Sequence, residues 1–274
     1  MKIATVGKGG SGKTTIAGTL ARILAGNGIQ VLAIDGDPNP NLAITLGIDR
    51  DTSSAIRSIP SNVMAVRQED DGTRKLYMTM SQSELLADYG TPAPDGIKLV
   101  TMGRPPDGSA GSGCMCASHR AVRGLITELS GSDEDTITDM EAGLEHLKRG
   151  TARNVDVMLI VAEPYYRSLE AAQRVWSLAN ELEIPHTFVI SNKVKNDADR
   201  AAVEEFCNKY DMQVIGEVPF DEQLVEAERN AKAPFDFDPE SAGVNSIREI
   251  AECLKTLKDP DEGPAPIGEQ ATPG

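Results

Sequence analysis

The sequence predicts an α/β fold with a doubly wound, mostly parallel sheet and helices on both faces. Short apolar runs alternate with helical patterns along nearly the whole chain, which is the order expected of parallel strands connected by helices. The chain has 274 residues, of which 40% are hydrophobic and 25% charged, so it can bury one core. The first apolar run leads into a glycine-rich turn and then into a helical pattern, an order typical of phosphate-binding loops.

Seven short apolar runs are expected to form strands, and even the longest of them is strand-sized. In chain order these are residues 2–6, 30–34, 97–102, 136–138, 156–162, 186–191 and 213–218. Five segments between or after them carry apolar residues at three- and four-residue spacing, which predicts helices with one buried face. These are residues 13–25, 120–129, 168–182, 199–210 and 246–257.

Two stretches interrupt this alternation. Residues 49–95 contain an acidic turn at 69–72 and a proline-rich segment at 91–94, so we expect an irregular excursion with one short helix near residues 81–88. The tail, residues 259–274, is rich in Pro, Gly and Glu and lacks apolar periodicity, which predicts disorder. Neither stretch is typical of a separate domain, so we expect a single domain over residues 1–258.

The balance of charge is strongly acidic. The 42 Asp and Glu residues outnumber the 27 Lys and Arg residues, and the formal net charge of -15 argues against a nucleic acid partner, because such binding draws its affinity from basic side chains. No apolar run approaches the roughly 20 residues that span a bilayer, and the N-terminus lacks the pattern of a signal peptide. We therefore expect a cytoplasmic protein without a membrane partner, whose four cysteines are too few for a disulfide framework.

Residues 7–15 read Gly-Lys-Gly-Gly-Ser-Gly-Lys-Thr-Thr and fit the G-x-x-x-x-G-K-T pattern. Glycines allow successive backbone N–H groups to point at a phosphate, and the helix N-terminus behind them adds partial positive charge. The motif predicts a P-loop NTPase in which Lys13 bridges the β and γ phosphates of ATP and Thr14 ligates Mg²⁺. The nucleotide-binding residues expected from this loop are Gly9, Gly10, Ser11, Gly12, Lys13, Thr14 and Thr15.

A second lysine, Lys8, lies inside the same loop. In this position it resembles the signature lysine of the deviant Walker A ATPases, the superfamily of MinD, ParA and the nitrogenase iron protein. The resemblance implies that Lys8 crosses a dimer interface to the partner's nucleotide, as an arginine finger does. It therefore implies a homodimer that forms on ATP binding.

Carboxylates follow two of the expected strands, at the sheet edge where open α/β folds bind ligands. The segment that begins at Asp37 resembles the superfamily's first switch, which implies that Asp37 orients the attacking water. Asp139 begins a segment that resembles the Walker B and second switch region, which implies that it holds Mg²⁺ through water and that Gly143 senses the γ phosphate. Asp35 is open between the outer shell of Mg²⁺, a hydrogen bond to the loop and a strand cap.

Two segments near the ends of later strands resemble the superfamily's base-binding positions. By this resemblance Asn192 reads the edge of adenine, and Pro219 belongs to the segment that flanks the base. Val194 and Lys195 follow Asn192 in place of an acidic residue that reads guanine, so ATP is expected rather than GTP.

The Cys114-Met115-Cys116 segment is expected to bind a metal ion. Two thiols one residue apart are too constrained for a comfortable disulfide, but they can present two sulfur ligands to one ion. Structural zinc and cluster sites usually need four ligands, and a twofold axis beside the pair would supply the other two. Bound by four thiolates, Ni²⁺ would favour a square-planar arrangement and Zn²⁺ a tetrahedral one, so the sequence leaves the metal open between the two.

These motifs together with residues 139–152, Asp-Met-Glu-Ala-Gly-Leu-Glu-His-Leu followed by Lys-Arg-Gly-Thr-Ala, closely resemble the CooC family of ATPases, which mature nickel carbon monoxide dehydrogenase. The resemblance covers residues 1–258. It implies an ATP-dependent dimer that handles nickel at the paired Cys114 and Cys116, with a nickel carbon monoxide dehydrogenase or a related enzyme as the client.

Other cysteines and histidines have weaker assignments. Cys207 and Cys253 fall on apolar faces of expected helices, which favours burial. His119 is either a metal ligand or, as we favour, a residue at a helix start. His146 lies seven residues after Asp139, where the nitrogenase iron protein carries a cluster cysteine, and it is either a metal ligand or a hydrogen-bonding switch residue.

Two other function classes compete with the metallochaperone. A MinD- or ParA-like positioning ATPase without metal calls for a basic amphipathic C-terminal helix or basic patches, and the acidic tail offers neither. An iron–sulfur reductase component would hold a cluster with the same four thiolates.

Overall fold

The structure is a computed structural model, and it describes residues 1–37, 39–60, 63–68, 72, 74–102, 124, 134–140 and 154–258. Its centre is a sheet whose described strands run in the order β10-β9-β8-β1-β7-β2-β6-β5. All neighbouring strands pair in parallel except β5, which pairs antiparallel with β6. The strands of this sheet are β1 (Lys2–Gly7), β2 (Val31–Gly36), β5 (Thr91–Pro92), β6 (Lys98–Thr101), β7 (Asp135–Met140), β8 (Val157–Ala162), β9 (His186–Val194) and β10 (Val214–Pro219). The predicted fold class is confirmed, and so are the seven expected strands.

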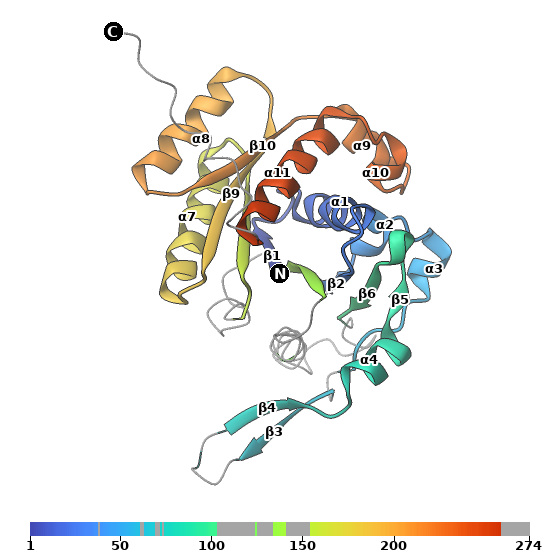
Figure 1. Cartoon of the computed structure of the whole chain (residues 1–274). Helices are drawn as coiled ribbons and strands as arrows, with labels where there is room; N and C mark the ends of the chain where they lie inside the picture. Colours follow the sequence, from blue (N-terminus) through green and yellow to red (C-terminus); the bar gives the residue numbers. More distant parts are fainter. Residues whose placement is uncertain are drawn as a thin grey trace, which may run out of the picture.

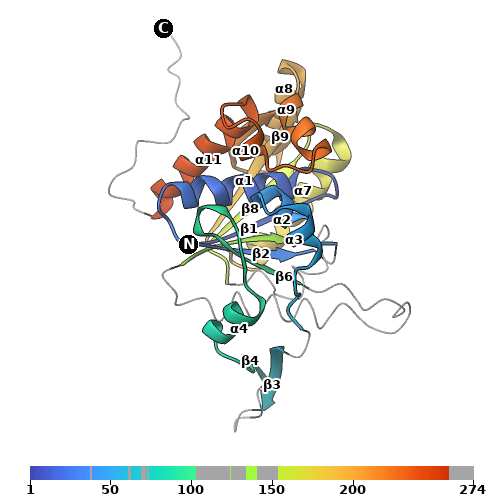
Figure 2. The same ribbon diagram turned by 90° about the vertical axis from the view of Figure 1, so that its right-hand side faces the viewer.

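Helices connect the strands and cover both faces of the sheet (Figures 1 and 2). In the described residues they are α1 (Lys13–Gly26), α2 (Leu42–Leu46), α3 (Arg50–Ser54), α4 (Gln82–Tyr89), the 3₁₀ helix η2 (Pro94–Gly96), α7 (Tyr166–Glu181), α8 (Asp197–Lys209), α9 (Glu222–Arg229), α10 (Pro234–Phe237) and α11 (Ala242–Lys258). Four of the five expected helices are confirmed, and the fifth, at 120–129, lies outside the described residues apart from residue 124.

Alternation along the central strands divides the core between the two faces. Ile3 of β1 packs with α1, α2 and α11, whereas its neighbour Ala4 belongs to the cluster formed with α4, α7 and α8. Strands buried on both faces read as continuous apolar runs, which is why the sequence located them well.

The excursion at residues 49–95 is more regular than expected. The short helix near 81–88 is confirmed as α4, which begins with a capping box formed by Ser81 and Glu84. The excursion also contains an antiparallel hairpin of β3 (Met64–Gln68) and β4 (Arg74–Met78), which extends away from the main sheet (Figure 1). The sequence did not indicate this hairpin because its strands are short and carry charged residues.

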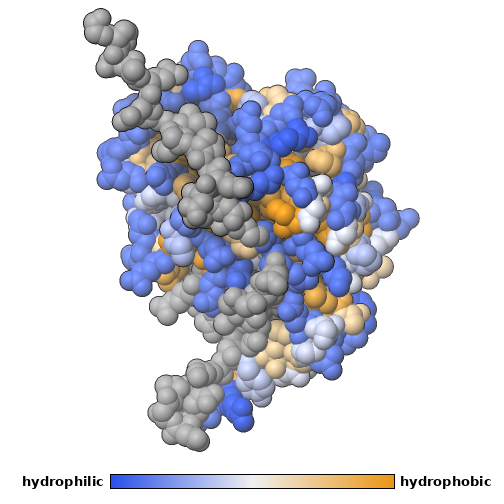
Figure 3. All heavy atoms as spheres, viewed as in Figure 1, coloured by the Kyte–Doolittle hydropathy of each residue, from blue (hydrophilic) through white to orange (hydrophobic). Residues whose placement is uncertain are grey.

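The surface seen in Figure 3 is largely hydrophilic, and its apolar groups are small and scattered. No helix in the described parts of the chain is both long and apolar enough to cross a membrane. The tail, residues 259–274, lies outside the described residues, so its expected disorder stays a prediction.

Candidate functional site

The P-loop connects β1 to α1 at the carboxyl edge of the sheet. Gly12, the residue before α1, has a left-handed conformation with φ of 96°, and a Cβ atom added there would lie 2.3 Å from Nδ2 of Asn192. Glycine is therefore required at this position by both backbone conformation and space. Among the residues that the structure describes, no side chain caps the N-terminus of α1. Its first backbone N–H groups are thus available to an anion, and the helix dipole favours negative charge there.

Lys13 and Thr14, the first residues of α1, direct their side chains toward the loop and the sheet. The Nζ atom of Lys13 lies 3.5 Å from the backbone oxygen of Lys8, so the side chain folds back over the loop. The Thr14 hydroxyl donates to Oδ2 of Asp139 at 2.5 Å, and the Thr5 hydroxyl donates to Oδ1 at 3.1 Å. The structure thus brings together Lys13, Thr14 and Asp139, as the motifs predict.

The environment of Asp139 suits a divalent cation. Burial raises the pKa of this carboxyl to about 6, although the hydrogen bond from Thr14 and the charge of Lys13 act in the opposite direction. A carboxylate that has lost its hydration is stabilised by a cation that replaces it, and hydroxyl and carboxylate oxygens are the ligands that Mg²⁺ prefers. The residues present therefore fit Mg²⁺.

Asp35 holds the first switch segment in place. Its side chain, 1% exposed, accepts hydrogen bonds from the backbone N–H groups of Asp37 at 3.2 Å, Asn41 at 3.0 Å and Leu42 at 2.9 Å. Burial and then the nearby charge of Asp139 raise the pKa of Asp35 to about 7, although these hydrogen bonds oppose the shift. Of the three roles left open by the sequence, these bonds to the backbone that follows β2 fit the strand cap, which also holds the switch segment that carries Asp37.

Residues at the end of β9 fasten the P-loop from the side. The Asn192 amide donates through Nδ2 to the backbone oxygen of Ser11 at 2.7 Å. Lys193, with a left-handed φ of 61°, donates from Nζ to the backbone oxygen of Gly10 at 2.6 Å. These two loop carbonyls therefore accept hydrogen bonds from β9 side chains, while the Ser11 N–H donates within the loop to the backbone oxygen of Lys8 at 3.1 Å.

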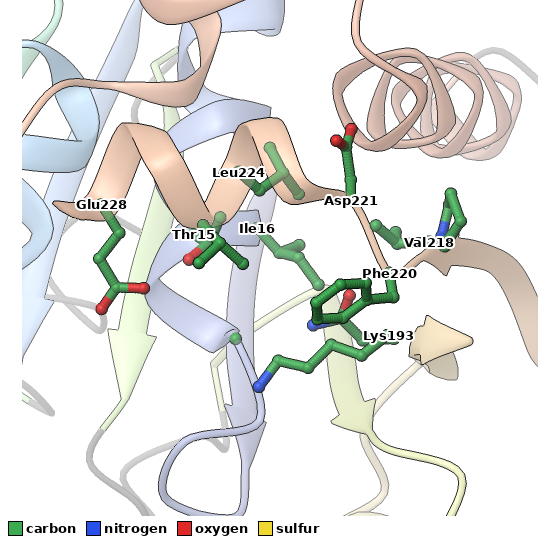
Figure 4. Close-up of a pocket in the computed structure, with 12 residues that line it drawn as sticks. Thr15, Ile16, Lys193, Val218, Phe220, Asp221, Leu224 and Glu228 are labelled. Carbon is green, nitrogen blue, oxygen red and sulfur yellow. The ribbon is translucent and has the colours of Figure 1, made fainter. Parts of the chain in front are cut away.

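A pocket lies beside the P-loop, between α1, α9 and the ends of β9 and β10. It is small, with a volume of about 60 Å³, below the range of sites that enclose a whole small molecule. Figure 4 shows Leu224 and Glu228 on α9 near Thr15, with Phe220 and Lys193 beside each other at another side. The full lining is Gly12, Thr15, Ile16, Asn192, Lys193, Val218, Pro219, Phe220, Asp221, Leu224, Val225 and Glu228. The expected base-binding residues Asn192 and Pro219 thus share one pocket next to the phosphate loop.

A network beside the P-loop was not anticipated from the sequence. The Tyr165 hydroxyl donates to Oε2 of Glu163, and Oε1 of Glu163 pairs with Nζ of Lys193 at 3.0 Å. The hydrogen bond to Glu163 and then burial raise the pKa of Tyr165 to about 12. The Lys8 ammonium lies over the Tyr165 ring, 5.0 Å from its centroid. The Glu-Pro-Tyr-Tyr sequence after an apolar strand was the available signal, but sequence alone does not show that it faces the loop.

The expected metal-binding cysteines lie outside the described residues. The same is true of His119, Gly143 and His146, so their assignments stay predictions. In the described ranges, no cluster of three or more His, Cys, Asp or Glu side chains could hold a metal ion. Cys207 is buried as expected, and burial raises its pKa to about 11, whereas Cys253 is only half-buried.

Comparison with known proteins identifies the family. Residues 2–235 match the CobQ/CobB/MinD/ParA nucleotide binding domain. The chain belongs to this family. It is 37% identical over 245 residues to the carbon monoxide dehydrogenase accessory protein CooC of Rhodospirillum rubrum, a match that covers 87% of this chain and 91% of that protein. It is 36% identical to an uncharacterised ATP-binding protein of Methanocaldococcus jannaschii, over 94% of this chain and 99% of that protein.

Solved structures agree on the fold. The septum site-determining protein MinD of Pyrococcus horikoshii, complexed with Mg-ADP, aligns with a TM-score of 0.71 at 20% identity and covers 94% of this chain and 97% of that one. The similarity to CooC and the MinD/ParA superfamily that the motifs indicate is confirmed. With the P-loop in place, the chain is an ATPase of this family, and its nucleotide site is built for ATP and Mg²⁺.

Proposed function

We propose that this protein is an ATP-hydrolysing metallochaperone that dimerises with nucleotide and assists nickel insertion into carbon monoxide dehydrogenase or a related nickel enzyme. The observation that carries the proposal is the 37% identity to the carbon monoxide dehydrogenase accessory protein CooC, which extends over nearly the full length of both chains. The motifs of the phosphate loop, both switches and the Cys-x-Cys pair support the same assignment.

ATP is held by its phosphates in the P-loop and by its base in the adjoining pocket. Lys13 contacts the β and γ phosphates, and the N–H groups at the start of α1 donate to their oxygens. Thr14 and Asp139 would hold Mg²⁺. The chemistry that Mg²⁺ supplies when bound is neutralisation of charge on the phosphate oxygens.

Asp37 orients the attacking water for hydrolysis. Its backbone N–H is fixed by Asp35, and its own Oδ1 accepts from the N–H of Asn39 at 2.8 Å, so the carboxylate has a defined direction. A carboxylate fixed in this way can align a water molecule and accept its proton.

Asn192 favours adenine over guanine. Its Nδ2 is engaged by Ser11, which leaves Oδ1 to accept a hydrogen bond. Adenine presents a 6-amino donor at the corresponding position, whereas guanine presents a carbonyl acceptor, which Oδ1 would repel.

ATP brings two chains together, with Lys8 of each reaching the nucleotide of the other. The dimer places two Cys114 and Cys116 pairs at its axis, where four thiolates bind one Ni²⁺ ion as cargo. Hydrolysis loosens the dimer and releases the ion to the client.

The test is metal content in the nucleotide-bound dimer. We expect wild-type protein with a nonhydrolysable ATP analogue to bind one Ni²⁺ per dimer, and the double variant Cys114→Ser with Cys116→Ser to bind none while still folding. Cys253→Ser, which removes a half-buried thiol elsewhere, is the matched control and should retain the metal. Stoichiometric nickel in the double variant would reject the site. Visible absorption typical of an iron–sulfur cluster in anaerobically purified dimer would favour a reductase component instead.

Dimer formation is tested separately by molecular mass in solution. Lys8→Ala should bind ATP as a monomer but should not dimerise, whereas Lys13→Ala should lose tight ATP binding. ATP-induced dimers of the Lys8 variant would contradict the role assigned to this lysine.

A further inference from the structure

The ammonium group of Lys8 lies against an aromatic side chain of its own subunit. Its Nζ is 5.0 Å from the centroid of the Tyr165 ring, within the distance at which a cation is attracted to the face of an aromatic ring. Among the described residues, no carboxylate forms an ion pair with Lys8, and the Tyr165 ring is the group that contacts its ammonium.

The Tyr165 ring is held in a fixed orientation. Tyr165 is the residue before α7, and its backbone oxygen accepts from the N–H groups of Ser168 at 2.9 Å and Leu169 at 3.1 Å. At the other end of the side chain, the hydroxyl donates to Oε2 of Glu163. The backbone and the hydroxyl of Tyr165 are therefore both held by hydrogen bonds, although 43% of the residue is exposed to solvent.

The same carboxylate links the ring to the loop that carries Lys8. Glu163 pairs through Oε1 with Lys193, and Lys193 donates to the backbone oxygen of Gly10. Gly10 lies two residues after Lys8, so the Glu163 carboxylate is connected both to the Tyr165 ring and, through Lys193, to the loop that carries Lys8. A chance contact between a surface lysine and a tyrosine does not require the additional link through Glu163 and Lys193 to the loop.

We propose that Tyr165 is a positioning residue that holds the signature lysine in cis in the nucleotide-free subunit, so that dimerisation has to withdraw Lys8 from the ring before it can reach the partner's nucleotide. This inference rests on the proposed function, in which Lys8 acts in trans. The contact weakens dimerisation, because the ATP-bound loop and the partner must together offer the ammonium a stronger site than the ring.

The size of the effect follows from the strength of cation–π contacts. At exposed sites such a contact changes an equilibrium by roughly 2.3- to 5.4-fold. Two lysines are withdrawn when a symmetric dimer forms, so the two factors multiply. We expect removal of the ring to strengthen the ATP-bound dimer by about 5- to 30-fold in its dissociation constant.

The first experiment observes the contact in the nucleotide-free monomer. Protons above an aromatic ring resonate upfield, so the ε-methylene protons of Lys8 should show an upfield NMR shift in wild-type protein and in Tyr165→Phe. The shift should be absent in Tyr165→Leu. An unshifted Lys8 signal in wild-type protein would overturn the proposal whether or not the protein dimerises.

The second experiment measures the dimer dissociation constant by sedimentation with a nonhydrolysable ATP analogue. Tyr165→Leu should dimerise about 5- to 30-fold more tightly than wild type. Tyr165→Phe keeps the ring but frees it from Glu163, so it should fall between the two. Tyr166→Leu makes the same change at the neighbouring residue, which is 69% exposed, and should match wild type.

The outcomes separate this inference from the proposed function. A Tyr165→Leu dimer that is unchanged or weaker overturns the cis-holding role, because a tyrosine that only contributes to the interface would weaken the dimer when removed. If Tyr165→Leu does not fold, the dimer dissociation constant of Tyr165→Phe is compared with that of wild type, and an unchanged or weaker dimer overturns the cis-holding role. If wild-type protein does not dimerise with ATP, the proposed dimer fails and the release of Lys8 fails with it, even where the NMR shift is present.

Discussion

Replacement of Asn192 by Ala tests whether one side chain both braces the phosphate loop and reads the base. The Nδ2 atom donates to the backbone oxygen of Ser11 at 2.7 Å, and Asn192 is only 5% exposed. Removal of a buried donor leaves its acceptor unsatisfied, at a cost of about 1–3 kcal/mol. We expect the free energy of unfolding of the nucleotide-free protein to fall by this amount.

The same substitution removes the hydrogen-bond acceptor for the adenine amino group. One such bond contributes about 0.5–1.5 kcal/mol, so ATP affinity should fall by roughly 2- to 10-fold. GTP affinity should fall less, because the repulsion between Oδ1 and the guanine carbonyl is lost as well. The ratio of ATP to GTP affinity should therefore approach one.

Urea denaturation and calorimetric titration with ATP and GTP measure these two effects. Ser191→Ala is a matched control, because Ser191 is equally buried in β9 and no described residue bonds its hydroxyl. This control should change the free energy of unfolding by less than about 0.5 kcal/mol and leave the ATP preference intact. If Asn192→Ala behaves like the control in both assays, the double role of Asn192 is refuted.

Three further predictions concern hydrolysis, stability and pH. Asp37→Asn should lower phosphate release by a factor on the order of 10² while ATP-induced dimers persist, and normal turnover would reject its role in orienting water. Arg22 is buried and donates to Asp236 at 2.7 Å and 2.8 Å and to the Leu46 carbonyl at 2.9 Å. Arg22→Leu removes these bonds, so the free energy of unfolding measured by denaturation should fall by about 2 kcal/mol or more. A change below 0.5 kcal/mol, on the order of that for an ordinary surface substitution, would contradict it. Burial raises the pKa of the Asp139 carboxyl to about 6, so protons should compete with Mg²⁺ below that pH. The affinity for Mg²⁺, measured in the presence of ADP, should therefore be constant above pH 7 and fall as the pH is lowered further. A Mg²⁺ affinity that stays constant down to pH 5 would count against Asp139 as a Mg²⁺-binding residue.

The phosphate half of the site could be predicted from the sequence because it is local. The loop from Gly7 to Thr15 consists of consecutive residues between one strand and one helix, and each residue type has a direct conformational or chemical reason. The sheet strands were equally accessible, because burial on both faces produces continuous apolar runs. Asp37 and Asp139 were located by the same logic, since the ends of parallel strands meet at one edge.

The hairpin and the short helices around the pocket were not accessible in this way. The hairpin strands β3 and β4 contain Arg67, Arg74 and Lys75, and their alternation is too short to distinguish from an irregular segment. Helix α9 lines the pocket, but its eight residues contain mainly polar side chains, and only its place in the folded chain, packed against α10, makes it a wall of the site.

The sequence by itself determined the fold class, the phosphate loop and the carboxylates that follow β2 and β7, since these depend on patterns within short stretches of chain. Only the tertiary structure decided that Asn192 and Lys193 hold the carbonyls of Ser11 and Gly10, and that Tyr165 lies under Lys8. These contacts join residues about 150 to 180 positions apart, and they arise because β1, β8 and β9 are neighbours in the sheet. Strand order is set by how helices pack on both faces of the whole sheet, and no single segment of sequence encodes it.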